Sequence, residues 1–369
     1  MQAVILAGGE GTRLRPLTSS VPKAVVRLVD RPFIAFMLQW LRGHGIDDVI
    51  MSCGFLADGV RAVLGDGSRF GVRLRYVEEP EPRGTAGALK LAEPMLDSRF
   101  LMLNGDVLTD IDLGAQLDQH ARTGARATLA LVAVADPSAY GLVVLSEDHA
   151  VRDFVEKPDV AGGGRSDSNL ISAGAYVLER EILGLVAPGR KVSIEGEIWP
   201  ALIGAGLYGF PSDSYWLDIG TPARYLQGTF DILEGNVRTD VRARLGPQWL
   251  AVGEGAEVLG RLVPPALVGA RTRIAQGARV GALVVLGDDV TVGAQSTVER
   301  SVILDGARIG DGCELRDCVV AQGAQVGDGT KLTGGAVIGE GVRIGADNVI
   351  SRGARIFPGA DLPDRAIEF

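Results

Sequence analysis

A six-residue repeat governs the last third of this 369-residue chain and constrains its fold more than any other feature. Two five-residue steps, at 298–303 and 315–320, interrupt an otherwise regular spacing of aliphatic side chains. The positions that keep the register are Ile274, Val280, Leu286, Val292, Val298, Ile303, Ile309, Leu315, Val320, Val326, Leu332, Ile338, Ile344, Ile350, Ile356 and Leu362. Gly or Ala often follows the aliphatic residue, as at Ile309-Gly310. This pattern predicts a parallel β-helix, in which three steps make one coil and the aliphatic side chains stack inside.

The first 235 residues have a different pattern, in which short apolar runs alternate with amphipathic stretches. The runs that predict strands are Val4–Ala7, Val49–Cys53, Val72–Val77, Phe100–Leu103 and Thr128–Val132. Phe33, Phe36, Met37, Trp40 and Leu41 share one face at helical spacing. This alternation predicts an α/β fold with a doubly wound, mostly parallel, Rossmann-like sheet. Such a sheet binds ligands in the crevice beyond the carboxyl ends of its strands.

A predicted helix from about Thr221 to Glu234 is followed by an irregular stretch through Gly246-Pro247 and Gly253. The repeat itself resembles the left-handed β-helix of hexapeptide-repeat proteins. We therefore expect a catalytic domain at 1–235, a linker at 236–256 and a left-handed β-helix at 257–369.

Composition excludes several classes of partner. A net charge of −9 and a pI near 5.0 disfavour nucleic acid and anionic membranes. No stretch approaches the length of a membrane span, and the N-terminus carries no basic leader. Cys53, Cys313 and Cys318 lack the spacing of metal ligands. We expect a cytoplasmic protein with no nucleic acid or membrane partner.

A glycine-rich turn follows the first predicted strand, from Leu6 to Pro16. Its glycines allow backbone N–H groups to approach an anion, and Arg13 offers a charged fork to phosphate oxygens. The Gly-Lys-Ser/Thr ending of a P-loop is absent. Lys23, ten residues after Arg13, adds a second cation for the same triphosphate.

Lysine usage marks two positions, because the chain has only five lysines among its 37 cationic side chains. Lys23 follows Pro22, and Lys157 lies in Glu156-Lys157-Pro158. A chain that otherwise prefers arginine thus places a compact ammonium group in each of these motifs.

Two aspartates follow predicted strands, Asp106 in Asn104-Gly-Asp106 and Asp218 in Trp216-Leu-Asp218. Either alone would more often be a turn former or a helix cap. Paired carboxylates at a crevice are suited to Mg²⁺, which keeps several waters and bridges substrate phosphates. Together with Arg13 and Lys23 they indicate a phosphate-handling site.

In combination, these motifs resemble those of the sugar-nucleotide pyrophosphorylases, most closely the mannose-1-phosphate guanylyltransferases that end in a β-helix. The motifs, in chain order, are Leu6 to Pro16, Pro22-Lys23, Gly84-Thr-Ala-Gly87, Asn104-Gly-Asp106, Phe154-Val-Glu-Lys-Pro158, Ser172-Ala-Gly-Ala-Tyr176, Ser193-Ile-Glu195 and Trp216 to Pro222. The resemblance covers essentially the whole chain.

The resemblance implies that GTP and mannose 1-phosphate react to GDP-mannose and pyrophosphate. The implied catalytic residues are Arg13, Lys23, Asp106, Lys157 and Asp218, with Asp106 and Asp218 holding Mg²⁺. The implied nucleotide-binding residues are Leu6, Ala7, Gly8, Gly9, Gly11, Thr12, Glu79, Gly84 and Thr85. The implied sugar-phosphate residues are Gly141, Glu156, Lys157, Ser172 and Glu195. Ser172 departs from the Asn that is common in the family, which weakens the assignment of the sugar.

The choice of base depends on Glu79. Thymidylyltransferases of the superfamily carry Gln at what looks like the same position, and Gln both donates and accepts. An ionised Glu only accepts, which suits the two adjacent donors of guanine. The alternative is that Glu79 is a solvated loop carboxylate, in which case a glucose-1-phosphate thymidylyltransferase or another NDP-hexose synthase remains open.

Two further alternatives concern the whole chain. A catalytically silent regulatory subunit is disfavoured because the five catalytic candidates are present. An acyltransferase within the β-helix is disfavoured because His44, His120 and His149 all precede the repeats. We expect the β-helix to mediate homo-oligomer assembly or regulation.

Overall fold

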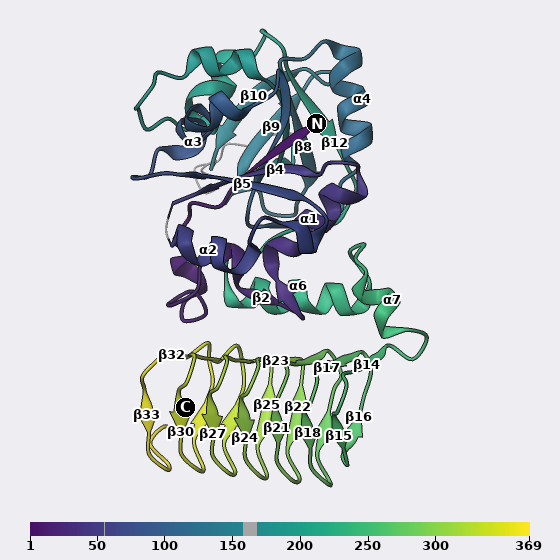
Figure 1. The fold of residues 1–369 in the computed structure, drawn as a ribbon, viewed down its shortest axis with the longest axis vertical. Helices are drawn as coiled ribbons and strands as arrows, with labels where there is room; N and C mark the ends of the chain where they lie inside the picture. Colours follow the sequence, from purple (N-terminus) through teal and green to yellow (C-terminus); the bar gives the residue numbers. More distant parts are fainter. Residues whose placement is uncertain (55, 158–167) are drawn as a thin grey trace. The chain divides into compact units, whose positions relative to one another are not determined.

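A computed structural model describes residues 1–54, 56–157 and 168–369. The fold divides into two compact units (Figure 1). The first unit comprises Met1–Gly9 and Ile34–Leu217, and the second comprises Glu10–Phe33 and Asp218–Phe369.

The first unit is built on a nine-stranded sheet. Its strands in order are β10 (Val151–Glu156), β9 (Gly141–Leu145), β11 (Leu170–Glu179), β6 (Arg99–Asn104), β1 (Gln2–Leu6), β4 (Asp48–Cys53) and β5 (Arg73–Glu78), with β8 (Ala127–Ala133) pairing β11 and β12 (Leu207–Pro211) pairing β8. All five predicted strands are present. Strands β5, β4, β1 and β6 run parallel, whereas β11 pairs antiparallel with β6, β8 and β9. The sheet is therefore mixed, and the expected parallel arrangement describes the four strands from β6 to the edge strand β5.

Helices cover this sheet because their apolar faces need burial. They are α1 (Phe33–Gly43), α2 (Ala57–Leu64), α3 (Gly84–Ala92), α4 (Leu113–Thr123) and α5 (Trp199–Leu202). Helix α3 contacts β1 and β4, and α4 contacts β8, β11 and β12. On α1 the predicted apolar face is buried at Phe36, Met37 and Leu41, and half-buried Trp40 donates from Nε1 to the Ile111 carbonyl at 2.9 Å.

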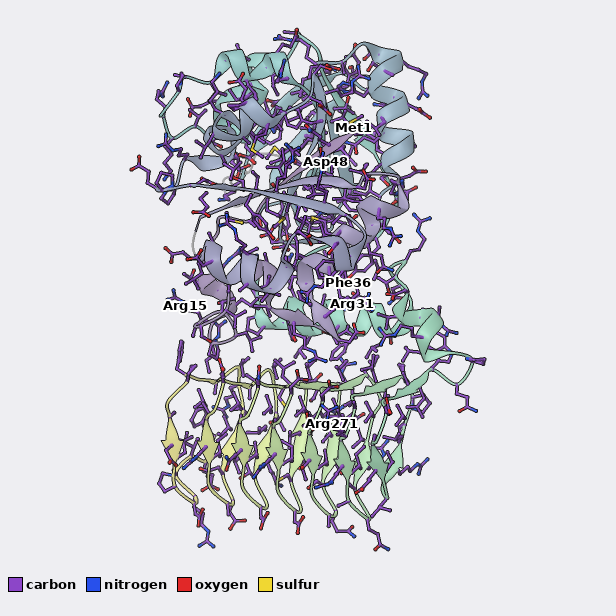
Figure 2. All side chains as sticks on the ribbon, in the orientation of Figure 1. Met1, Arg15, Arg31, Phe36, Asp48 and Arg271 are labelled. Carbon is purple, nitrogen blue, oxygen red and sulfur yellow. The ribbon has the colours of Figure 1, made fainter. Side chains whose placement is uncertain are left out.

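Parallel pairing places the carboxyl ends of β5, β4, β1 and β6 along one edge of the sheet. At the opposite ends lies Asp48 of β4, which is labelled in Figure 2. It accepts from Gln2 Nε2 at 3.0 Å and from Arg75. A short strand pair, β7 (Val107–Thr109) with β13 (Trp216–Asp218), completes the unit.

The second unit begins with the segment Glu10–Phe33, which holds two short 3₁₀ helices (Thr12–Leu14 and Lys23–Val25) and the strand pair β2 (Arg27–Leu28) and β3 (Arg31–Pro32). Helix α6 (Pro222–Glu234) matches the predicted helix, and Thr221 caps it by accepting from the Arg224 N–H. The Tyr225 hydroxyl of α6 donates to the Arg27 carbonyl at 2.7 Å, which ties α6 to the segment.

The rest of the second unit is a stack of coils, drawn green to yellow in Figure 1. Three parallel sheets of seven, seven and six strands run along it, consistent with the predicted left-handed β-helix. The first contains β14 (Leu250–Val252), β17 (Ala266–Val268), β20 (Val284–Leu286), β23 (Ser301–Ile303), β26 (Val319–Val320), β29 (Val337–Ile338) and β32 (Arg355–Ile356). The second contains β15 (Glu257–Val258), β18 (Arg273–Ile274), β21 (Thr291–Val292), β24 (Arg308–Ile309), β27 (Gln325–Val326), β30 (Arg343–Ile344) and β33 (Asp361–Leu362). The third contains β16 (Arg261–Leu262), β19 (Arg279–Val280), β22 (Thr297–Glu299), β25 (Glu314–Arg316), β28 (Lys331–Leu332) and β31 (Val349–Ile350).

Every aliphatic position of the predicted register lies on one of these strands, and those from Ile274 to Ile350 are buried in one apolar core. Glycine follows the aliphatic residue because successive coils nearly touch there. A Cβ at Gly327 would lie 2.5 Å from the backbone carbon of Gly345. The five-residue steps turn through single residues in the left-handed region, Arg300 (φ 46°) and Asp317 (φ 49°).

The stretch expected to be irregular contains more structure than predicted. A short helix, α7 (Val241–Leu245), follows α6, and β14 lies between Gly246 and Gly253. Because β14 pairs with β17, the first coil begins before residue 257. Within the described residues, no helix combines the length and apolar character needed to cross a bilayer.

Candidate active site

The carboxyl ends of the four parallel strands bring the first group of predicted residues together. The chain leaves β1 at Leu6, and the Ala7 N–H donates to the Ser52 carbonyl of β4 at 2.8 Å. On the other side of β1, the Gly105 N–H donates to the Leu6 carbonyl at 2.9 Å. The glycines allow this approach, since a Cβ at Gly105 would lie 2.6 Å from the Leu6 carbonyl oxygen.

Glu79 directly follows β5, and hydrogen bonds hold its carboxylate against this turn. Its Oε1 accepts from the Ser52 hydroxyl at 3.0 Å, and its Oε2 accepts from the Arg83 N–H at 3.3 Å. A Cβ at Gly8 would lie 3.2 Å from Oε1. The carboxylate is half-buried and fixed in direction beside the glycine-rich turn.

Thr85 and Glu195 also meet in the first unit. The Thr85 hydroxyl donates to Glu195 Oε2 at 2.8 Å and accepts from the Ile194 N–H at 2.7 Å. Gly84 makes this possible, because its φ of 69° is left-handed and a Cβ there would lie 2.6 Å from the Val192 carbonyl oxygen. The motif from Gly84 and the motif that ends at Glu195 thus form one structure.

A second cluster contains Gly141, Glu156 and Lys157. A Cβ at Gly141 would lie 3.1 Å from Glu156 Oε2, and the Lys157 Nζ lies 3.8 Å from Glu156 Oε1. Partial burial raises the pKa of Glu156, and the negative charge of Glu195 raises it further, while Lys157 opposes both. Lys157 itself has a left-handed φ of 49°, a conformation that non-glycine residues seldom adopt outside constrained sites. Pro158, which ends this motif, lies outside the described residues.

Ser172 lies on β11, where the pairing with β8 is irregular between Ser172 and Tyr176. Its hydroxyl lies 2.9 Å from the Tyr176 hydroxyl, and burial together with the charge of Glu195 raises the pKa of Tyr176. Asn104 packs against Gly174, where a Cβ would lie 2.9 Å from the Asn104 amide nitrogen. Ser172 is therefore held beside Tyr176 at the irregular stretch of β11.

Asp106 is half-buried and follows β6 after the close approach at Gly105. The first unit thus contains Asp106 together with Leu6, Ala7, Gly8, Gly9, Glu79, Gly84, Thr85, Gly141, Glu156, Lys157, Ser172 and Glu195.

The second unit contains the other predicted residues, which are Gly11, Thr12, Arg13, Lys23 and Asp218. Gly11 has a left-handed φ of 63° and caps the 3₁₀ turn that carries Arg13. Its carbonyl accepts from the Thr18 hydroxyl at 2.7 Å, and a Cβ at Gly11 would lie 3.0 Å from Lys23 Cβ. The glycine thus packs the two cation-bearing turns against each other.

Asp218 and Arg13 converge on Gly220. A Cβ at Gly220 would lie 3.0 Å from Asp218 Oδ2 and 3.2 Å from Arg13 Nη2. Arg224, in the first turn of α6, forms an ion pair with Asp218 Oδ1. Asp218 is thus oriented by one arginine and lies close to a second.

Sequence reasoning missed three of these contacts, those made by Ser52, Tyr176 and Arg224. Ser52 lies inside an apolar strand run, and Tyr176 was noted only as the end of a motif. Arg224 follows the Trp216 to Pro222 motif. Because the sequence predicts that a helix begins at about Thr221, it could have placed Arg224 in the first turn of that helix, near Asp218. In the part of the chain that the structure describes, no group of three or more His, Cys, Asp or Glu side chains forms a ready metal cage. A cation here needs ligands from substrate phosphates or water.

Comparisons with known proteins identify the family of the chain. A family model described as nucleotidyl transferase matches residues 2–235, and one described as GMPPB C-terminal domain matches residues 262–367. The chain is 36% identical over 318 residues to a mannose-1-phosphate guanylyltransferase of Mycobacterium tuberculosis, covering 85% of this chain and 82% of the relative. It is 31% identical over 341 residues to a UTP–glucose-1-phosphate uridylyltransferase of Synechocystis, covering 86% of each. The crystal structure of HddC from Yersinia pseudotuberculosis complexed with GMP-PN is 28% identical, with a TM-score of 0.54, and covers 63% of this chain and 99% of that chain.

Proposed function

The chain belongs to the nucleotidyl transferase family and is a sugar-1-phosphate nucleotidyltransferase, and we propose that its substrates are GTP and mannose 1-phosphate. The observation that carries the choice of base is the fixed orientation of Glu79 beside Gly8. The names of several relatives agree with the choice, since mannose-1-phosphate guanyltransferases of Emericella nidulans and Candida albicans are 34% and 32% identical to this chain.

Guanine recognition follows from the acceptor character of Glu79. Each oxygen of an ionised carboxylate offers two acceptor sites, so Ser52 and Arg83 use one site on each oxygen. One site on each oxygen then serves the ring N–H and the exocyclic amine of guanine as a bidentate pair. Thymine and uracil offer one ring N–H between two carbonyl oxygens, which the carboxylate repels.

In the proposed reaction, an oxygen of the sugar phosphate attacks the α-phosphorus of the nucleotide in line. The bond from the α-phosphorus to the bridging oxygen of pyrophosphate breaks, and its electrons leave with the pyrophosphate. Two unit charges about 4 Å apart repel by roughly 4 kcal/mol at an effective dielectric near 20, so the protein must mainly neutralise and align. Arg13 and Lys23 stabilise the pyrophosphate, and Lys157 orients the attacking phosphate.

The sugar site in this proposal is formed by Gly141, Glu156, Ser172 and Glu195. Two carboxylates of this cluster accept hydroxyl hydrogen bonds, as Glu195 already does from Thr85 and Ser193. Gly141 brings its backbone close to Glu156, and a larger residue there would collide with Phe154, since a Cβ would lie 2.5 Å from the Phe154 ring. Ser172 is shorter than the Asn common in the family, and its hydroxyl lies 2.9 Å from the Tyr176 hydroxyl.

Nucleotidyltransferases of this family generally use a divalent metal ion, and we propose Mg²⁺ with Asp106 and Asp218 as its protein ligands. Carboxylate oxygens are the donors that Mg²⁺ prefers, and two carboxylates without a protein cage fit an ion that keeps waters and substrate phosphates. The ion would neutralise phosphate charge during the transfer. Arg224 supports this role, since its ion pair fixes the direction of Asp218 while the second oxygen faces Gly220.

Further proposals concern organisation. We propose the division expected from the sequence, a catalytic domain at 1–235, a linker at 236–256 and a β-helix at 257–369, with the first coil extended back to β14. We also propose homo-oligomer assembly through the β-helix. A cytoplasmic location is supported by three free, buried cysteines, and burial raises the pKa of Cys53 to about 12. A thiol so fully protonated near neutral pH has little tendency to form disulfides.

A matrix of substrates tests the function. Purified full-length protein is incubated with Mg²⁺, each of GTP, dTTP, UTP and ATP, and each of mannose, glucose and galactose 1-phosphates, and pyrophosphate release is measured. We expect the highest kcat/KM for GTP with mannose 1-phosphate. Preference for dTTP or UTP would move the protein to the thymidylyltransferase or uridylyltransferase alternative, and no release from any pair would favour a silent subunit.

A further inference from the structure

The last coils of the β-helix contact the segment that carries Arg13 and Lys23, and both parts belong to the second unit. We propose that Arg355, on β32, is a positioning residue that holds the glycine-rich loop in its working conformation. This inference rests on the proposed function, because it assigns an effect on the pyrophosphate-binding cations. It also gives the β-helix an indirect part in the reaction, although no catalytic residue is assigned to the repeats.

The central observation is a pair of hydrogen bonds from one side-chain nitrogen. Arg355 Nη1 donates to the Arg13 carbonyl at 3.0 Å and to the Arg15 carbonyl at 3.1 Å. Both acceptors are backbone groups, so the bonds do not depend on the side chains at these positions. They fix the backbone at the residue whose guanidinium faces Gly220 and Asp218.

Two other coils reach the same segment. The Ser20 hydroxyl donates to Glu340 Oε2 at 2.8 Å, and Arg27 Nη1 forms an ion pair with Asp305. Asp305 follows β23 and Glu340 follows β29, so the segment is contacted at three points along the stack. Of the three contacts, the one made by Arg355 falls on Arg13 itself.

The loop needs such a contact because its own hydrogen bonding is local. The 3₁₀ helix that carries Arg13 spans only Thr12–Leu14 and is closed by the Leu14 N–H to the Gly11 carbonyl at 3.0 Å. A turn of three residues does little by itself to fix the direction of the long Arg13 side chain. Displacement of a catalytic group by about 1 Å can reduce the rate about 100-fold, so a modest contact to the backbone has a large effect on turnover.

The expected effect is specific to the step that Arg13 serves. Because Arg13 acts on the leaving pyrophosphate, loss of the Arg355 contacts should lower kcat and raise the KM for GTP, with little change in the KM for mannose 1-phosphate. The two bonds are exposed, so their effect on global stability should be small. We expect kcat/KM for GTP to fall by about 3- to 10-fold, the range that one or two net hydrogen bonds carry.

The experiment uses the full chain with Arg355→Met, Arg355→Lys and the control Arg343→Met. Arg343 lies on β30 and is equally exposed, and none of the hydrogen bonds of the described residues joins it to residues 10–33. Steady-state kinetics are measured with each substrate varied in turn, and hydrogen exchange is followed at the amides of residues 11–16. Arg355→Met should lower kcat/KM for GTP and raise exchange in the loop, Arg355→Lys should recover part of both, and Arg343→Met should match the wild type.

The two proposals fail in different ways. If the wild type releases no pyrophosphate from any substrate pair, the proposed function is wrong, and the exchange measurement still tests the contact. If the wild type is active while Arg355→Met leaves both kinetics and exchange unchanged, the positioning role is wrong. Equal loss of activity in the Arg355→Met and Arg343→Met proteins, with equal loss of thermal stability, would also overturn it.

Discussion

Glu79→Gln is the substitution that tests the choice of base most directly. In the wild type, both carboxylate oxygens accept, one from Ser52 at 3.0 Å and one from the Arg83 N–H at 3.3 Å. A Gln must keep its carbonyl oxygen toward the Arg83 N–H, because its amide group would oppose that donor. The amide group then faces Ser52, whose hydroxyl can accept, so the fold should tolerate the change.

The substitution should weaken the binding of guanine. One of the two acceptors for the base becomes a donor that opposes a guanine N–H, and the charge that strengthens the remaining bond is lost. Hydrogen bonds to charged groups carry about 1.5 to 3 kcal/mol, which corresponds to about a 10- to 150-fold fall in kcat/KM for GTP. A donor and an acceptor side by side match a pyrimidine edge, so the relative use of dTTP and UTP should rise.

The measurement is the ratio of kcat/KM for GTP to that for dTTP at saturating mannose 1-phosphate. Glu81→Gln is the matched control, since Glu81 lies in the same loop with a 73% exposed side chain. An unchanged ratio in Glu79→Gln, or a wild type that already prefers dTTP, would refute the argument. A ratio that falls equally in both variants would show that loop charge, and not the contact to the base, governs the choice.

Three other predictions follow from the proposed site. Asp106→Asn or Asp218→Asn should lower turnover by orders of magnitude at limiting Mg²⁺ without changing the circular dichroism spectrum. A chelator should abolish the activity of the wild type reversibly. Near-normal turnover in either variant would show that its carboxylate is not a metal ligand. Glu195→Gln should lower the pKa of Glu156, because burial and the charge of Glu195 raise that pKa above its ordinary value of 4.5. A carbon-13 NMR titration of Glu156 measures the change. An unchanged pKa would show that the two carboxylates do not interact. The folded state holds the Glu156 proton more tightly than the unfolded chain does, so this group stabilises the fold below its ordinary pKa and loses that effect as pH rises through the raised value. Truncation after Gly235 should abolish oligomers and lower activity while some catalytic residues stay in place. If light scattering shows that the full-length and the truncated protein are both monomers, assembly through the β-helix is contradicted.

The sequence predicts the repeat region most fully because its information is local. Each aliphatic residue of the register, from Ile274 to Leu362, lies on a separate short strand. An error in the assignment of one position would therefore not alter the register of the others. The five-residue steps were visible as spacing, but the left-handed residue that turns each corner, Arg300 or Asp317, needed the backbone. The start of the first coil at β14 was hidden because Leu250–Val252 precedes any regular repeat.

In the first unit, the parallel core was predictable from the apolar runs, whereas the antiparallel strands were not. Strand β11 pairs with β6, β8 and β9, and no spacing along the chain encodes which neighbours it takes. The same limit applies to the site. The motifs located Glu79, Thr85 and Glu195, but the Thr85–Glu195 hydrogen bond joins residues that are 110 positions apart.

The grouping of Glu10–Phe33 with the β-helix was beyond any pattern in the sequence, because polar contacts between distant segments leave no periodic trace. Arg355 and the Arg13 carbonyl are 342 positions apart, and the acceptor is a backbone atom that every residue type supplies. An arginine at the edge of a repeat looks like a solubilising side chain until its partner is known. On this proposal, the cations assigned to pyrophosphate depend on a part of the chain to which no catalytic group is assigned. Selection for turnover can act on the last coils through this contact, which is why substitutions there should change kinetics before they change the stability of the fold.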